Sequence, residues 1–257
     1  MRNRAALAAL VAAMCASPAR ASPDTLSIGA FSASRPGAGS PSGWEPMDLD
    51  KGGHRTQYTL VEDGGATVLK AVAHASASGL TRKLHANPAE YPLLRWRWKV
   101  ANLIKDGDLH KKEGDDFPAR LYVMFDYPLS ALSFGDRIKL QLARAFYGSD
   151  LPAATLCYVW DGNAPAGTIA PSAYTDRVRI IVVESGAAHV NRWVTVVRDI
   201  SQDFKAAFGQ EPPEMSAVAL VTDTDNTGAS ATAWYGDISL HKRAVSGPRA
   251  LQPDGRN

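Results

Sequence analysis

One stretch, Leu93 to Val100, limits the fold more than any other part of the chain, because from Leu94 onward apolar side chains alternate strictly with basic ones. In an extended strand, successive side chains point to opposite faces, so its two tryptophans lie on one face and its three basic residues on the other. Such a strand buries one face and leaves the other in water, which favours an antiparallel sheet. A second stretch, Gly114 to Phe125, begins with an acidic turn, and we expect it to pair with the first.

Strand-like runs separated by turn-forming residues occur along most of the chain. They span Thr56 to Glu62, Thr67 to Ala75, Gly79 to Leu84, Leu93 to Val100, Ala119 to Asp126, Thr155 to Trp160, Val178 to Glu184, Arg192 to Asp199, Ala217 to Thr222 and Ala231 to Leu240. About ten short strands with regular turns predict an all-β fold, a sandwich or a barrel, and of the two we expect an antiparallel β-sandwich. Helical patterns interrupt it twice, from Asp136 to before Gly148 and from Ile200 to Gly209, and predict one or two short helical inserts.

Residues 1–21 have the pattern of a secretory signal peptide, with a basic start, an apolar stretch and the small-x-small site Ala19-Arg20-Ala21. We therefore expect a periplasmic or secreted protein. Residues 22–43 are rich in Ser, Pro, Gly and Ala and predict a flexible leader, residues 44–241 a single β-sandwich domain, and residues 242–257 a disordered tail. No apolar stretch approaches the roughly 20 residues that span a bilayer, so we expect no membrane span.

Charge and cysteine content exclude some classes of partner and chemistry. Removing Arg2, Arg4 and Arg20 with the signal peptide leaves 25 basic against 26 acidic residues, a net charge of −1. Binding to nucleic acid or to an anionic membrane calls for a strongly basic field, so we expect neither partner. Cys157 is the one cysteine after the signal peptide, and its apolar neighbours indicate a buried, inert thiol.

Several separated motifs occur in a fixed order along the chain: Trp96-Arg97-Trp98-Lys99, the run from Gly114 to Val123, Tyr158-Val159-Trp160, Trp193 with Arg198-Asp199, the run from Thr222 to Thr227, and Tyr235-Gly236-Asp237-Ile238. Together they resemble a bacterial exported family known as domain of unknown function 3047. This resemblance implies an exported single domain and brings no established activity. The C-terminal half also resembles galactose-binding-like jelly rolls, including many carbohydrate-binding modules, and that likeness selects a jelly roll among sandwiches.

The candidate ligand site combines aromatic and charged side chains that share strand faces. The residues expected there are Trp98, Asp115, Asp116, Arg120, Tyr122, Tyr158, Trp160, Asp223 and Asp225. Rings beside Arg and Asp suit a carbohydrate, so we expect non-catalytic binding of a glycan or another polar ligand of the cell envelope. One alternative is a polysaccharide-acting hydrolase that uses Asp115 or Asp116 with an unidentified second carboxylate. The other is a structural or protein-interaction domain, in which the same rings are core.

A metal site is the one cofactor that the sequence suggests, and no other is required. Asp223-Thr224-Asp225-Asn226-Thr227-Gly228 matches the opening of a calcium loop, with oxygen ligands at alternate positions and Gly at the sixth. The twelfth position is Trp234 in place of the Glu of an EF-hand. We therefore predict either a jelly-roll calcium site near Asp223 and Asp225, joined by Asp237, or a plain Asx-rich turn.

Overall fold

The computed structural model describes residues 23–49, 53–126, 135 and 154–243. All ten predicted strands occur there, with ends displaced by one or two residues, and the helix predicted after Asp136 lies outside the described residues. The strands are β1 (Thr25–Gly29), β2 (Glu45–Asp48), β3 (Gln57–Asp63), β4 (Ala66–His74), β5 (Ala77–Ala86), β6 (Leu93–Val100), β7 (Ala119–Phe125), β8 (Ala154–Asp161), β9 (Ile169–Pro171), β10 (Val178–Ser185), β11 (Val194–Asp199), β12 (Met215–Asp223) and β13 (Ser230–His241). The helices are η1 (Phe31–Ala33), η2 (Lys112–Gly114) and α2 (Ile200–Phe208).

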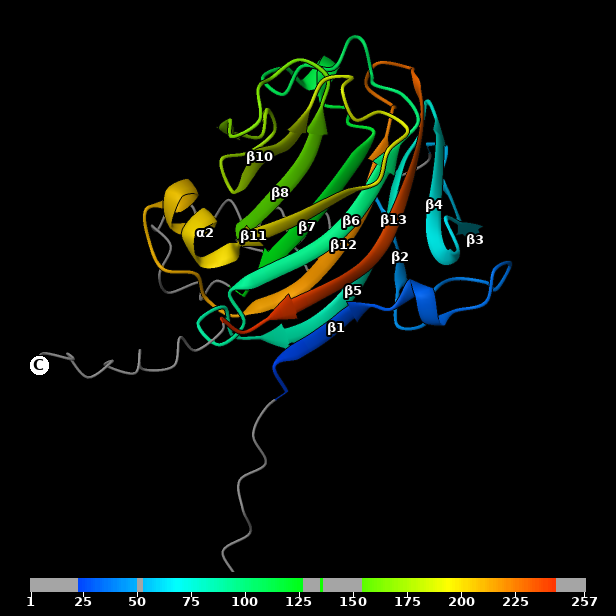
Figure 1. Ribbon diagram of the computed structural model, residues 1–257. Helices are drawn as coiled ribbons and strands as arrows, with labels where there is room; N and C mark the ends of the chain where they lie inside the picture. Colours follow the sequence, from blue (N-terminus) through cyan, green and yellow to red (C-terminus); the bar gives the residue numbers. More distant parts are fainter. Residues whose placement is uncertain (1–22, 50–52, 127–134, 136–153, 244–257) are drawn as a thin grey trace, which may run out of the picture.

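The strands form two sheets packed face to face, with α2 at one end beside β11 and β8 (Figure 1). Sheet A has the order β11-β6-β13-β4-β3, and β1 also pairs with β13. Sheet B has the order β2-β5-β12-β7-β8-β10-β9. Both sheets contribute to one large apolar core. The predicted all-β sandwich is confirmed, with one refinement: β8 and β10 are parallel, so sheet B is mixed.

The alternation that defines β6 is confirmed by its burial. Trp96 and Trp98 are buried in the core, whereas Arg95 is exposed on the outer face of sheet A. The neighbours of β6 are β11 and β13, and those of β7 are β12 and β8. The expected pairing of Leu93 to Val100 with Gly114 to Phe125 is therefore wrong. The two strands bury their apolar faces in the same core from opposite sheets.

The predicted second helix is confirmed as α2, and its ends follow from local chemistry. The Asp199 carboxylate accepts a hydrogen bond from the Gln202 backbone N–H at 3.1 Å, which caps the helix N-terminus. Gly209 ends the helix with φ of 75°, a left-handed conformation that glycine adopts without steric cost. Phe204 packs its ring 4.6 Å from Phe125, which docks α2 on the core. No helix in the described ranges is long and apolar enough to cross a membrane.

The segment expected to be a flexible leader carries structure instead. Thr25–Gly29 pairs with β13 as β1, and Ile28 and Phe31 lie in the core. Phe31 also packs against Trp44, with ring centroids 5.5 Å apart. Composition suggested flexibility because small residues dominate the segment, but a few well-spaced apolar side chains are enough to dock it on the sandwich.

Candidate functional site

Three of the predicted ligand-contacting rings lie in the core. Trp98, Tyr158 and Trp160 are each 0% exposed. The Trp98 and Trp160 rings pack 6.3 Å apart between the sheets, and the Tyr158 hydroxyl donates to Asp203 at 2.8 Å. The expected convergence of these rings with Arg120 in one open hollow is therefore wrong. Tyr158 and Trp160 point to the inner face of sheet B, whereas Arg120 and Tyr122 point to its outer face.

Arg120 is the centre of a buried polar cluster at one end of sheet B. Its Nε donates to Asp223 Oδ1 at 2.9 Å, and another guanidinium nitrogen forms an ion pair with Asp223 Oδ2. The same guanidinium lies 3.4 Å from Asp115 Oδ1 and 3.2 Å from the Tyr122 hydroxyl. It also stacks over the Phe117 ring, 4.4 Å from the centroid. Asp115, Arg120, Tyr122 and Asp223 were expected in one site, and they do contact one another. They form a buried network inside the protein and not an open ligand site.

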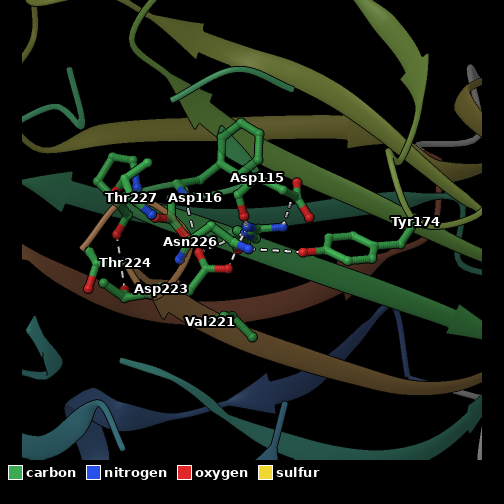
Figure 2. A network of polar contacts seen from close by, with 12 residues as sticks. Asp115, Asp116, Tyr174, Val221, Asp223, Thr224, Asn226 and Thr227 are labelled. Atoms are coloured by element: carbon green, nitrogen blue, oxygen red, sulfur yellow. Dashed lines mark hydrogen bonds and ion pairs between the residues drawn. The ribbon is translucent and has the colours of Figure 1, made fainter. Parts of the chain in front are cut away.

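Asp116 connects this cluster to the loop between β12 and β13. Its carboxylate accepts hydrogen bonds from the backbone N–H groups of Asn226 and Thr227, at 3.2 and 2.7 Å, and from the Thr227 hydroxyl at 2.6 Å (Figure 2). The Asn226 amide in turn donates to the Tyr174 hydroxyl at 2.9 Å. The Asp116 side chain thus fixes the turn that follows β12.

Three carboxylates converge where these contacts meet. Asp116, Asp223 and Asp225 each place an oxygen within 4.8 Å of the others, a spacing at which one cation can contact all three. Oxygen ligands of this kind suit Ca²⁺. Asp237 is not among them, because its carboxylate accepts from the Ser32 backbone N–H at 2.8 Å and from the Ser32 hydroxyl. The predicted participation of Asp237 is therefore wrong, and Asp116 was missed because it lies more than a hundred residues away in sequence.

The electrostatics of the cluster favour a cation. Asp115, Asp116 and Asp223 are buried around the single guanidinium of Arg120, so negative charge is in excess. Burial raises the pKa of Asp223 to about 7, with the Asp116 and Asp115 charges adding to the effect and Arg120 opposing it. Burial also raises the pKa of Asp115. A bound metal ion would compensate the excess charge.

The same burial bears on the two residues considered as hydrolytic carboxylates. Asp115 and Asp116 are 7% and 2% exposed, and both are already engaged, by Arg120 and by the loop backbone. Both carboxyl groups are therefore enclosed, which does not favour the hydrolase alternative. Cys157 is also buried, and burial raises the pKa of its thiol to about 12, which agrees with the prediction of an inert side chain.

The outer face of sheet A carries a group of side chains that the sequence reasoning did not assign to a site. We call it the aromatic–cationic row, and it consists of Lys70, Trp234, Lys99, Trp193 and Arg97. Lys99 Nζ lies 4.3 Å from the centroid of Trp234 and 5.4 Å from that of Trp193, and the Arg97 guanidinium lies 4.6 Å over Trp193. All five side chains are half-buried. The basic positions of β6 were a signal for this row, but no pattern placed Trp193 beside them.

A carboxylate and a strand irregularity hold the row in place. Asp63, on the edge strand β3, accepts from Lys99 Nζ at 2.5 Å and from the Trp193 indole N–H at 2.9 Å. The register of β13 against β6 shifts between Tyr235 and Ile238, a β-bulge. A groove of about 250 Å³ opens beside the row on the same face. Its lining residues are Arg95, Trp96, Arg97, Thr195, Asp237, Ser239 and His241.

These observations define a class of protein: a two-sheet β-sandwich with an acidic loop cluster at one end of sheet B and a cationic, tryptophan-bearing outer face on sheet A. Residues 42–239 match the family described as "Protein of unknown function (DUF3047)". The chain belongs to this family, as its motifs predicted. No curated protein sequence matches it.

Solved structures with a similar fold include proteins that contact glycans. One is the xyloglucanase domain of NopAA, a type three effector from Sinorhizobium fredii, in complex with cellobiose; its TM-score is 0.44 at 9% identity, over 79% of this chain and 94% of that one. Another is the family 30 carbohydrate-binding module of a cellulosomal cellulase from Clostridium thermocellum, with a TM-score of 0.34 at 15% identity, over 85% of this chain and 98% of that one. At this level the likeness concerns the fold alone.

Proposed function

We propose that this protein is a non-catalytic binding domain that holds a glycan or another polar ligand of the cell envelope on the outer face of sheet A. The observation that carries the proposal is the aromatic–cationic row beside an open groove on a single sheet face. The ligand class is the one expected from the sequence. Its proposed site is now the outer face of sheet A, and not the residues around Arg120. The signal-like N-terminus supports a periplasmic or secreted location for the domain.

The chemistry of the row suits a polar ligand with apolar patches. Trp193 and Trp234 offer apolar surface for the C–H faces of sugar rings. A guanidinium stacked on an indole keeps its N–H donors in its own plane, directed past the ring edge, where a hydroxyl can accept from them. Because the cations contact the rings and Asp63 anchors Lys99, the row is ordered before a ligand arrives. Such preorganisation lowers the entropic cost of binding.

We also propose that Asp116, Asp223 and Asp225 hold a structural calcium ion. The excess of buried carboxylates over guanidinium groups supports this assignment, as does the all-oxygen composition of the triad. The ion would brace the loop between β12 and β13 by neutralising the carboxylate that caps it. In this role calcium stabilises the fold and takes no part in ligand contact.

The binding function is tested by affinity electrophoresis of the purified mature protein against a panel of envelope polysaccharides and peptidoglycan fragments. We expect at least one of them to retard the wild type and Trp234→Ala to weaken that binding by about tenfold. Tyr174→Ala is the matched control, because Tyr174 is an exposed ring with Lys112 over it, located away from sheet A. No retardation by any panel member, or equal losses in both variants, would contradict the proposal.

A further inference from the structure

The groove beside the row is lined by two arginines, and the charge of one of them, Arg97, also acts on Asp63. Arg95 and Arg97 follow each other on the outer face of β6 and both line the groove. Within the described part of the chain, neither guanidinium forms an ion pair with a carboxylate. Unpaired arginines side by side on one strand repel each other, so an anionic ligand would relieve that repulsion.

The position of Arg97 is set by the backbone as well as by stacking. A Cβ atom added to Gly236 would lie 2.5 Å from both Cγ and Nε of Arg97, a distance that real contacts do not reach. Glycine at the β13 bulge therefore gives the arginine side chain room to lie against the strand. The guanidinium of Arg97 also lies over the Trp193 ring, 4.6 Å from its centroid. These two contacts hold the guanidinium at the groove.

Besides the two arginines, the lining contains one indole ring, that of Trp96, one carboxylate and three other polar side chains. His241 contacts the Thr25 hydroxyl at 3.1 Å and the Ser239 hydroxyl at 2.8 Å through its two ring nitrogens. The Asp237 carboxylate accepts from the backbone and hydroxyl of Ser32. The groove therefore offers two guanidinium groups and several hydroxyl groups, against one carboxylate that Ser32 already holds.

We propose that this groove binds the carboxylate of a uronic acid unit, so that the ligand is an acidic, carboxylated glycan. The inference rests on the proposed function and specifies its ligand class. A guanidinium fork matches a planar carboxylate through two parallel hydrogen bonds. In a uronic acid the carboxylate is attached to the sugar ring, so the ring lies beside Trp193 while the carboxylate reaches Arg95 and Arg97. The charge of the groove and the apolar surface of the row then serve one ligand.

The experiment compares two forms of one polymer, homogalacturonan of equal chain length, with the carboxylates free or methyl-esterified. We expect the wild type to bind the free acid about tenfold more tightly at low salt, and the preference to decrease as salt is added. Arg95→Gln and the double variant Arg95→Gln/Arg97→Gln should lose this preference. Arg82→Gln, on β5 of sheet B, is the control that should retain it. Thermal unfolding of each variant checks that the fold is kept. Because Arg95 is exposed, we expect Arg95→Gln to disturb the fold less than a change at Arg97.

The outcomes separate the inference from the function on which it rests. Equal binding of both polymers, or an unchanged preference in Arg95→Gln, overturns the carboxylate site and leaves glycan binding in place. Dextran sulfate binding as tightly as the free acid also overturns it, because the groove would then be a general polyanion site. Failure to bind either polymer or any glycan of the panel overturns both proposals.

Discussion

Asp63 is a single carboxylate on which the order of the aromatic–cationic row depends. Burial opposes its ionisation, but hydrogen bonds from Lys99 and Trp193 prevail and lower the pKa of Asp63 below its usual value. A carboxylate with a lowered native pKa contributes stability above its unfolded pKa and loses it as the pH falls through the native value. We therefore expect Asp63→Asn to lower the free energy of unfolding by about 1 kcal/mol at neutral pH, and by much less near about pH 3.

Urea denaturation of wild type and Asp63→Asn at the two pH values measures this difference. Asp48→Asn is the control, because Asp48 pairs with Arg55 at 2.6 Å while both side chains are well exposed, and such a pair contributes little. A pH-independent cost of Asp63→Asn would mean that the ionised state of the carboxylate is not what holds the row.

Residue-level reasoning succeeded where the neighbours are close in sequence and failed where they are not. Asp115 and Arg120 were expected in the same site, and they form an ion pair at 3.4 Å although they lie five positions apart. Trp98 and Trp160 were placed correctly on strand faces, but which face is inner depends on the sheet each strand joins. Alternation defines two faces and does not say which one the second sheet covers. The rings expected at a ligand site are therefore core.

At the level of elements, the sequence predicts what forms a strand better than what pairs with it. The bounds of β6 were predicted correctly, because apolar and basic side chains alternate without a break from Leu94 to its last residue. Its partners β13 and β11 come from distant parts of the chain, and nothing in the sequence of β6 specifies them. β9, with three residues, is too short to produce a periodic pattern.

The docking of β1 yields a prediction at this level. Phe31 is 1% exposed, directly after β1, and belongs to the main core. Phe31→Ala should lower the free energy of unfolding by about 3 kcal/mol or more, because it leaves a cavity beside Trp44. Urea denaturation measures the change. Leu49→Ala, a large apolar side chain that is 46% exposed, is the control and should have little effect. An unaffected Phe31→Ala variant would restore the flexible leader that composition suggested.

At the level of the whole molecule, the sandwich was predictable because each of its strands carries its own signal. Turn residues punctuate the chain at short intervals, and the alternating runs between them agree with one two-layer solution. The face proposed to bind the ligand was not predictable, because Lys70, Lys99 and Trp234 meet through the order of β4, β13 and β6 in sheet A. Topology, and not any local motif, assembles that surface.

The proposed calcium site would connect the stability of the whole molecule to metal binding. Asp116 precedes β7, Asp223 ends β12 and Asp225 lies in the loop that follows, so an ion shared by all three would tie two parts of sheet B together. A ligand that binds only the native state stabilises it, by about 2.7 kcal/mol at a hundredfold excess over Kd. For a domain of this size that corresponds to a rise in Tm of roughly 5 °C or more. We therefore expect Ca²⁺ to raise the Tm and EDTA to reverse the rise.

Asp225→Asn changes an exposed member of the triad and should abolish the shift in Tm, whereas Asp237→Asn, outside the triad, should keep it. An unchanged Tm in the wild type, or a shift that survives Asp225→Asn, would mean that Arg120 and the loop backbone alone balance these carboxylates.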